Sequence, residues 1–114
     1  MIDNDKRKHD RIDSVHLLNY VYFDVNGKET MQGMGRTLNV SKSGLLLETH
    51  TELELHHKVS LGIGIEDEMV DIRGKIVFTK TTDNDMYESG IHFLEPPPAA
   101  LEVLKKFIDA FNAR

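Results

Sequence analysis

The chain has 114 residues, 39% of them hydrophobic and 29% charged, which is an ordinary globular balance for one domain with a modest core. It contains no cysteine, which excludes disulfides, thiolate zinc sites and cysteine nucleophiles and fits a reducing cytoplasm. The net charge of −5 argues against general nucleic-acid binding, and no apolar run approaches the length of about eighteen residues that a membrane-spanning helix needs. We therefore expect a cytoplasmic protein with no membrane insertion and with a site on its surface.

Basic residues are concentrated at the N-terminus. Residues 1–11 carry four basic and three acidic side chains, a net charge of +1, whereas the other 103 residues carry 10 basic and 16 acidic side chains, a net charge of −6. We predict that residues 1–12 form a flexible N-terminal arm. A local basic segment on an acidic chain indicates a small anionic ligand rather than a long polyanion.

Residues 13–95 have the texture of β-structure, because short runs rich in β-branched and aromatic residues alternate with turn residues. Asn26-Gly27 predicts a hairpin turn, and Gly33 and Gly35 indicate a bulge or a close approach of two backbones. Six strands joined by short turns are typical of a small antiparallel β-barrel or sandwich. The predicted strands are residues 15–23, 30–38, 45–47, 59–65, 70–78 and 87–93.

Residues 96–114 predict a C-terminal α-helix that begins at Pro97 or Pro98, because proline is tolerated in the first helical turn. Apolar residues then recur at spacings of three and four, which places them on one helix face, and charged residues occupy the opposite face. We expect this helix to cover an open side of the barrel; a dimer contact is the alternative, so the chain is either a monomer or a weak dimer. The apolar face consists of Leu101, Leu104, Phe107, Ile108 and Phe111.

Two arginines four residues apart, Arg7 and Arg11, stand just before the first predicted strand. A guanidinium group presents a rigid fork of donors that can hold a phosphate with two bonds, and it can stack on a purine or donate to O6 and N7 of guanine. On a flexible segment, this pair could close over a ligand bound to the barrel. The alternative is a solvated charged leader, which is common at N-termini.

A polar turn, residues 39–44 with the sequence NVSKSG, follows the second predicted strand. Asn and Ser side chains bond to nearby backbone groups, and glycine takes backbone conformations that other residues avoid. The outward amide, the hydroxyl and the exposed N–H groups of such a turn suit a nucleotide. The alternative is a well-formed turn that binds no ligand.

Together, the two motifs resemble the PilZ family of cyclic di-GMP receptors, whose pattern is RxxxR before the first strand and (D/N)xSxxG about thirty residues later. Arg7 and Arg11 match the first motif. The second motif is matched by Asn39, Ser41 and Gly44. The resemblance extends to residues 74–78 and 90–93, which are similar to the last two strands of the family. It implies a six-stranded antiparallel β-barrel with a C-terminal helix and with cyclic di-GMP bound on the barrel surface.

The resemblance also implies a role for each matched residue. The two arginines hold phosphates and guanine faces, Asn39 and Ser41 contact guanine and phosphate, and Gly44 shapes the turn. Lys6 and Lys8 stand where many members of the family have further arginines, and a lysine is a point charge without the planar fork. The implied function is an effector whose arm changes conformation on binding and which signals to a protein partner that the sequence does not identify. A PilZ-like adaptor that binds proteins without ligand is the alternative.

Other residue patterns give no support for an enzyme, a cofactor or a metal site. The adjacent His56 and His57 would point to opposite faces of a strand, and no third ligand stands at a useful spacing. His92 lies between two apolar residues and is predicted to face away from them. A single-stranded nucleic-acid binder would need an aromatic platform and a basic groove, which three tyrosines, no tryptophan and a net charge of −5 do not supply.

Overall fold

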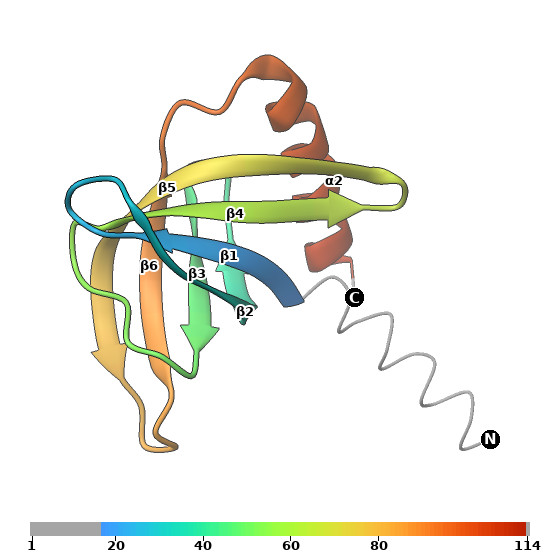
Figure 1. The fold of residues 1–114 in the computed structure, drawn as a ribbon. Helices are drawn as coiled ribbons and strands as arrows, with labels where there is room; N and C mark the ends of the chain where they lie inside the picture. The colour runs from blue at the N-terminus through green and yellow to red at the C-terminus, as the bar shows by residue number, and fades with distance from the viewer. Residues whose placement is uncertain (1–16, 114) are drawn as a thin grey trace.

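The computed structural model describes residues 17–113, which form a closed β-barrel and one helix (Figure 1). Neighbouring strands are antiparallel, and their order around the barrel is β1-β2-β3-β6-β5-β4. The predicted six-stranded antiparallel barrel with a C-terminal helix is therefore confirmed. The elements are β1 (Leu17–Phe23), β2 (Glu29–Val40), β3 (Gly44–Thr49), β4 (Lys58–Ile65), β5 (Glu68–Thr81), β6 (Tyr87–Phe93) and α2 (Pro98–Asn112).

Several strands are longer than the apolar runs that predicted them. β5 ends at Thr81 rather than at residue 78, because its polar end pairs with the start of β6. Asn39 belongs to β2, so the predicted polar turn is confined to residues 41–43. Backbone pairing with the neighbouring strand, and not side-chain hydrophobicity, sets these strand ends.

The loop between β1 and β2 contains the predicted glycine but is longer than a two-residue hairpin turn. The Asp24 carboxylate accepts hydrogen bonds of 2.9 Å from the backbone N–H groups of Asn26 and Lys28. Gly27 has φ of 80°, in the left-handed region that favours glycine. An aspartate side chain that bonds to the backbone, which is a common turn device, therefore shapes this loop together with the glycine.

The two glycines of β2 mark close contacts and not a bulge. A Cβ on Gly33 would lie 2.7 Å from the hydroxyl oxygen of Tyr20, and a Cβ on Gly35 would lie 2.7 Å from the Leu47 side chain. Of the two alternatives for these positions, the close approach is the observed one, although the backbone is approached by side chains rather than by another backbone.

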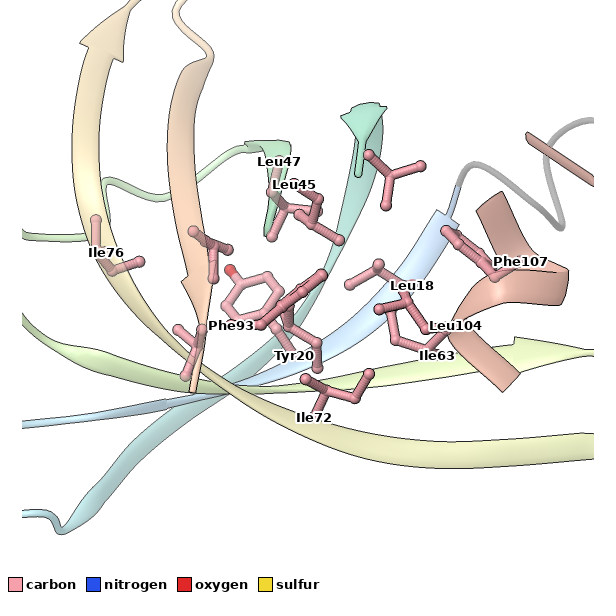
Figure 2. Packing of buried hydrophobic residues seen from close by; sticks show 14 of the residues in the cluster. Leu18, Tyr20, Leu45, Leu47, Ile63, Ile72, Ile76, Phe93, Leu104 and Phe107 are labelled. Atoms are coloured by element: carbon pink, nitrogen blue, oxygen red, sulfur yellow. The ribbon is translucent and has the colours of Figure 1, made fainter. Parts of the chain in front are cut away.

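The barrel interior holds one hydrophobic core, to which every strand contributes, β2 through Val40 and the other strands through alternate residues (Figure 2). On β1, Leu18, Tyr20 and Tyr22 are buried, while the residues between them face outward or are only half-buried. Burial raises the pKa of the Tyr20 phenol, so this side chain is a neutral part of the core. The predicted orientation of His92 is confirmed, since it is exposed between buried Ile91 and Phe93.

α2 begins at Pro98, as predicted, and packs against β4 and β5 at one end of the barrel (Figure 1). Phe107 lies near Leu18, Leu104 and Ile63 at this end (Figure 2), and Phe107 and Leu104 are each only 1% exposed. The apolar face is rotated slightly from the predicted one, since Leu101 and Ile108 are only partly buried. The buried residues of α2 are Ala100, Val103, Leu104, Phe107 and Phe111.

Gly44, the first residue of β3, lies directly against the backbone of β6. A Cβ at this position would approach the carbonyl oxygen of Ile91 to 2.2 Å, and a backbone atom cannot move aside as a flexible side chain can. Gly44 does not have a positive φ. The expectation that this glycine takes a backbone conformation closed to other residues is therefore wrong; the residue is glycine because two backbones meet here.

We expect Phe107→Ala to lower the free energy of unfolding by about 3–5 kcal/mol, because it removes a buried aromatic side chain and leaves a cavity under α2. Urea denaturation followed by circular dichroism measures this loss. Lys105→Ala, on the exposed face of the same helix, is the control and should change stability by less than about 0.5 kcal/mol. If the alanine variant does not fold, Phe107→Leu gives the smaller loss; equal stability of Phe107→Leu and wild type would contradict the assigned packing.

The same substitution at two glycines should have opposite consequences. Gly44→Ala should lower the free energy of unfolding by about 1–3 kcal/mol, because the added methyl group overlaps the backbone of β6. Gly62→Ala on β4 should leave stability unchanged or raise it by up to about 1 kcal/mol, since the nearest atom to its Cβ is 3.7 Å away. Thermal and urea denaturation of the two variants compare them directly, and equal effects would contradict the assigned role of Gly44.

Candidate functional site

Two β-bulges lie at the same level of the barrel, one on each side of the β3–β6 pair. In β2, Thr37 pairs with Leu47 and Asn39 pairs with Leu46, so Leu38 is an extra residue. The second bulge inserts one extra residue into β5 opposite β6, between residues 76 and 78. Each bulge shifts the alternation of its strand by one residue, which reverses the faces to which the following side chains point.

The β2 bulge explains why Asn39 is on the outer surface. Without the extra residue, the alternation that buries Thr37 would also bury Asn39 and expose Val40; instead Asn39 is exposed and Val40 is buried. The Asn39 amide oxygen accepts a hydrogen bond of 2.9 Å from the N–H of Val40. Its two amide N–H groups have no partner among the described residues, so they can donate to a ligand.

The turn after Asn39 is closed by Ser41. The backbone N–H of Ser41 donates to the carbonyl oxygen of Gly44 at 2.8 Å. The Ser41 hydroxyl donates to the same carbonyl oxygen at 3.3 Å and accepts from the N–H of Ser43, also at 3.3 Å. These hydroxyl bonds are long, and the side chain is exposed, so the turn does not depend on the hydroxyl alone and Oγ can also meet a ligand.

An open pocket of about 420 Å³ lies beside this turn. Its floor is apolar, with the half-buried Leu46 and the extra residue of the β5 bulge, Val77, which is 53% exposed. Gly90 lies opposite Leu46 in the register and adds no side chain to the surface. An apolar floor with a polar rim suits a flat base with an attached phosphate. The lining residues are Asn39, Val40, Ser41, Ser43, Gly44, Leu45, Leu46, Val77, Ile91 and His92.

Two lysines, on β5 and β4, lie on the outer face of the sheet beyond the pocket. His92 lies opposite Gly44, Lys75 lies opposite His92, and Lys58 lies opposite Lys75, so the four positions form one row across β3, β6, β5 and β4. Lys42, in the turn itself, is exposed. An acidic chain therefore carries a local group of cations beside the pocket, where they favour an anionic ligand.

The structure brings together Asn39, Ser41 and Gly44, three of the five predicted site residues. Arg7 and Arg11 lie outside the described residues. The sequence does not predict Leu46, Val77 or His92 as site residues, although residues 74–78 and 90–93 resemble strands of the PilZ family. The bulge at Val77 has no composition signal, because it depends on how β5 pairs with β6.

Among residues 17–113, no group of three or more His, Asp or Glu side chains is arranged to hold a metal ion. Within the same residues, no helix has both the length and the apolar composition needed to cross a membrane.

Comparisons with known proteins agree with the fold and the motifs. The sequence matches the family model of the PilZ domain over residues 5–110. The fold is similar to that of K. pneumonia MrkH in its apo state, with a TM-score of 0.60 at 16% sequence identity. The match covers 86% of this chain and 47% of that chain, so the chain spans about half the length of MrkH. A search of curated proteins finds no match.

The family match includes both sequence motifs, RxxxR and (D/N)xSxxG, and it extends over all six strands and most of α2. The structural likeness, at its low identity, shows a shared fold and agrees with the family match. The chain belongs to the PilZ domain family, a family of cyclic di-GMP receptors.

Proposed function

We propose that this protein is a cyclic di-GMP receptor that binds its ligand in the pocket beside the β2–β3 turn and performs no chemistry on it. The observation that carries the proposal is the outward placement of Asn39 by the β2 bulge, at the rim of an apolar pocket. Asn39 would donate to guanine, Ser41 and backbone N–H groups of the turn would meet a phosphate, and the floor of Leu46 and Val77 would contact a base.

The N-terminal arm can reach this pocket from where β1 begins. Leu17 pairs with Arg36, three residues before Asn39 on β2, which places Leu17 roughly 10–12 Å from Asn39. Arg11 precedes Leu17 by six residues, and six residues of extended chain span up to about 20 Å. Chain length therefore allows both predicted arginines to contact a ligand in the pocket.

In the proposed mechanism, ligand binding orders the arm over the pocket. Ordering costs conformational entropy, which charge-assisted bonds from Arg7 and Arg11 to phosphate offset. The ordered arm and the bound ligand then present a new surface, which favours or blocks a protein partner. Lys42 and α2 residues Lys105, Ile108 and Asp109 line one small pocket, so α2 borders the turn that would sense the ligand.

Arg11→Ala should weaken cyclic di-GMP binding by about 10- to 150-fold, or about 1.5–3 kcal/mol, the range for hydrogen bonds to charged groups. Ser41→Ala should cost less, about 0.5–1.5 kcal/mol, because one neutral bond is lost. Isothermal titration calorimetry measures both losses. Equal affinities of Arg11→Ala and wild type would exclude the arm from the mechanism.

Val77→Glu should weaken binding by at least about tenfold, since it replaces the apolar floor of the pocket with a charge that repels phosphate. Val25→Glu is the matched control, because Val25 is also exposed and lies in the β1–β2 loop away from the pocket. It should change affinity by less than about twofold. Similar losses in the two variants would show that added negative charge, rather than the pocket, determines the effect.

A titration of the full chain with cyclic di-GMP, with GTP and cyclic di-AMP as controls, tests the proposed function as a whole. We expect amide NMR shifts in residues 39–44 and at Leu46, Val77 and His92 with cyclic di-GMP alone. No shift with cyclic di-GMP would reject the receptor function and favour the ligand-independent adaptor.

A further inference from the structure

A second groove lies on the other side of β1 from the pocket, between the start of β1 and the β4–β5 hairpin. The ladder between β1 and β4 ends at the pair of Asn19 and Gly62, whereas β4 continues to Ile65 and pairs there with β5. The resulting β1–β4 groove has a volume of about 390 Å³. It is lined by Leu17, Leu18, Asn19, Met34, Gly64, Ile65, Glu66, Asp67, Glu68 and Met69.

The walls of the β1–β4 groove carry large apolar side chains that are exposed to solvent. Leu17, Met34 and Met69 are 42%, 55% and 68% exposed, and all three line it. Gly62 and Gly64 have no side chains on the outer face of β4, so nothing fills the groove at these two positions. Several large apolar side chains around one groove indicate a surface that another segment covers.

The tip of the hairpin adds negative charge to one end of the groove. Glu66, Asp67 and Glu68 are exposed, and Glu68 is paired with Lys106 at 3.1 Å. Neither Glu66 nor Asp67 has an ion-pair partner among the described residues. The groove therefore suits a segment that has an apolar side chain next to basic ones.

We propose that the N-terminal arm of the same chain occupies the β1–β4 groove when no ligand is bound, with Ile12 in the groove and Arg11 and Arg7 at Glu66 and Asp67. Leu17 is a wall of the groove, and Arg11 precedes it by six residues, a span of up to about 20 Å. Residues 1–11 have four basic and three acidic side chains, a net charge of +1 that is opposite in sign to the charge of the tip.

The covalent connection favours the arm over a second copy of the chain as the occupant. A segment attached beside its binding groove has an effective concentration in the millimolar range for a short linker, which a separate protein molecule does not reach in dilute solution. Sixteen residues precede Leu17, enough to cover a groove of this size.

This arrangement gives β1 two possible sites for the arm, one on each side. β2 lies on one side of β1 and leads to the ligand pocket, and β4 lies on the other side and leads to the acidic tip (Figure 1). Arg7 and Arg11 cannot be in both places, so the tip and the ligand compete for them. Docking of the arm in the groove does not depend on the proposed function. The competition between the acidic tip and the ligand rests on the proposed function, because it requires that the chain bind cyclic di-GMP.

Paramagnetic relaxation enhancement on the full chain tests the docking. The chain has no cysteine, so His9→Cys gives a single attachment point for a nitroxide and keeps both arginines. Without ligand, we expect the nitroxide to broaden the amide signals of Glu66, Asp67 and Met69. Absence of broadening at these residues in low salt would overturn the proposal.

Two neutralising variants separate the acidic tip from charge in general. Glu66→Gln/Asp67→Asn should reduce the broadening at the tip at least twofold. Asp83→Asn/Asp85→Asn is the matched control in the β5–β6 turn, since Asp85 has a positive φ (61°) like that of Glu66 (57°), and it should leave the broadening unchanged. Equal effects of the two pairs would overturn the assignment to the tip. Broadening of an unlabelled, isotope-enriched chain mixed with the nitroxide-labelled chain would assign the groove to a second copy and also overturn the proposal.

Ligand titration tests the competition. Releasing the arm should strengthen cyclic di-GMP binding of Glu66→Gln/Asp67→Asn by about two- to fourfold, as expected when half to three quarters of the chains hold the arm in the groove. Unchanged affinity despite lost broadening would overturn the competition. If the wild type binds no cyclic di-GMP, the proposed function and the competition fail, while the ligand-free broadening still decides the docking.

Discussion

The outer surface of this barrel depends on how β2 and β5 are registered against the β3–β6 pair. Gly44 allows the backbones of β3 and β6 to approach so closely that no other residue fits at its position. With that pair fixed, each flanking strand carries one extra residue at a similar level; the β2 bulge turns Asn39 outward, and the β5 bulge turns Phe78 outward. A one-residue change in either register would turn these side chains to the other face, because side chains alternate along a strand.

This constraint links the stability of the fold to the geometry of the site. Val40 is buried directly after Asn39, and Ile76 is buried directly before Val77, so each bulge adjoins a core residue as well as the β3–β6 ladder. The site is therefore carried by paired strands, with only the short turn of residues 41–43 outside the ladder. A site on paired backbone has little freedom to change shape, which leaves the arm and the surfaces it contacts as the parts of the proposed receptor that can respond to ligand.

The sequence predicted much of the fold, because alternation and turn residues report directly on strands. The six strands and the helix face were found in this way, and the placement of His92 followed from the apolar residues on each side of it. The bulges were not predicted, because an extra residue in one strand is defined only by its partner strand, which the local sequence does not identify. For the same reason Asn39 was assigned to a turn, whereas it is a strand residue that a bulge turns outward.

The sequence predicted part of the candidate site, but the reason that it gave for Gly44 differs from the one in the structure. Asn39, Ser41 and Gly44 were singled out by the motif, but Gly44 was expected to provide an unusual backbone conformation, and its lack of a side chain is what the β6 backbone requires. Leu46 and Val77 were not assigned, because an apolar residue on the outer face of a barrel looks like any other apolar residue in the sequence. Both face outward by alternation with buried neighbours, and only the tertiary structure shows which of the alternating residues face the core.

The distribution of charge explains why a receptor of this kind would need its arm. Outside residues 1–11 the chain has a net charge of −6, which opposes the approach of an anionic ligand, and the cations beside the pocket act only over a distance of about 8–10 Å at physiological salt. In the proposed receptor, Lys6 and Lys8 would add to the attraction as point charges, while Arg7 and Arg11 would add the planar fork that fixes a phosphate or a guanine in one orientation. The same two arginines are the groups that an acidic surface nearby would bind most readily. In a receptor whose ligand is held by only two guanidinium groups, a competing contact of modest strength, such as the one proposed at the β4–β5 tip, would measurably lower the affinity for the ligand.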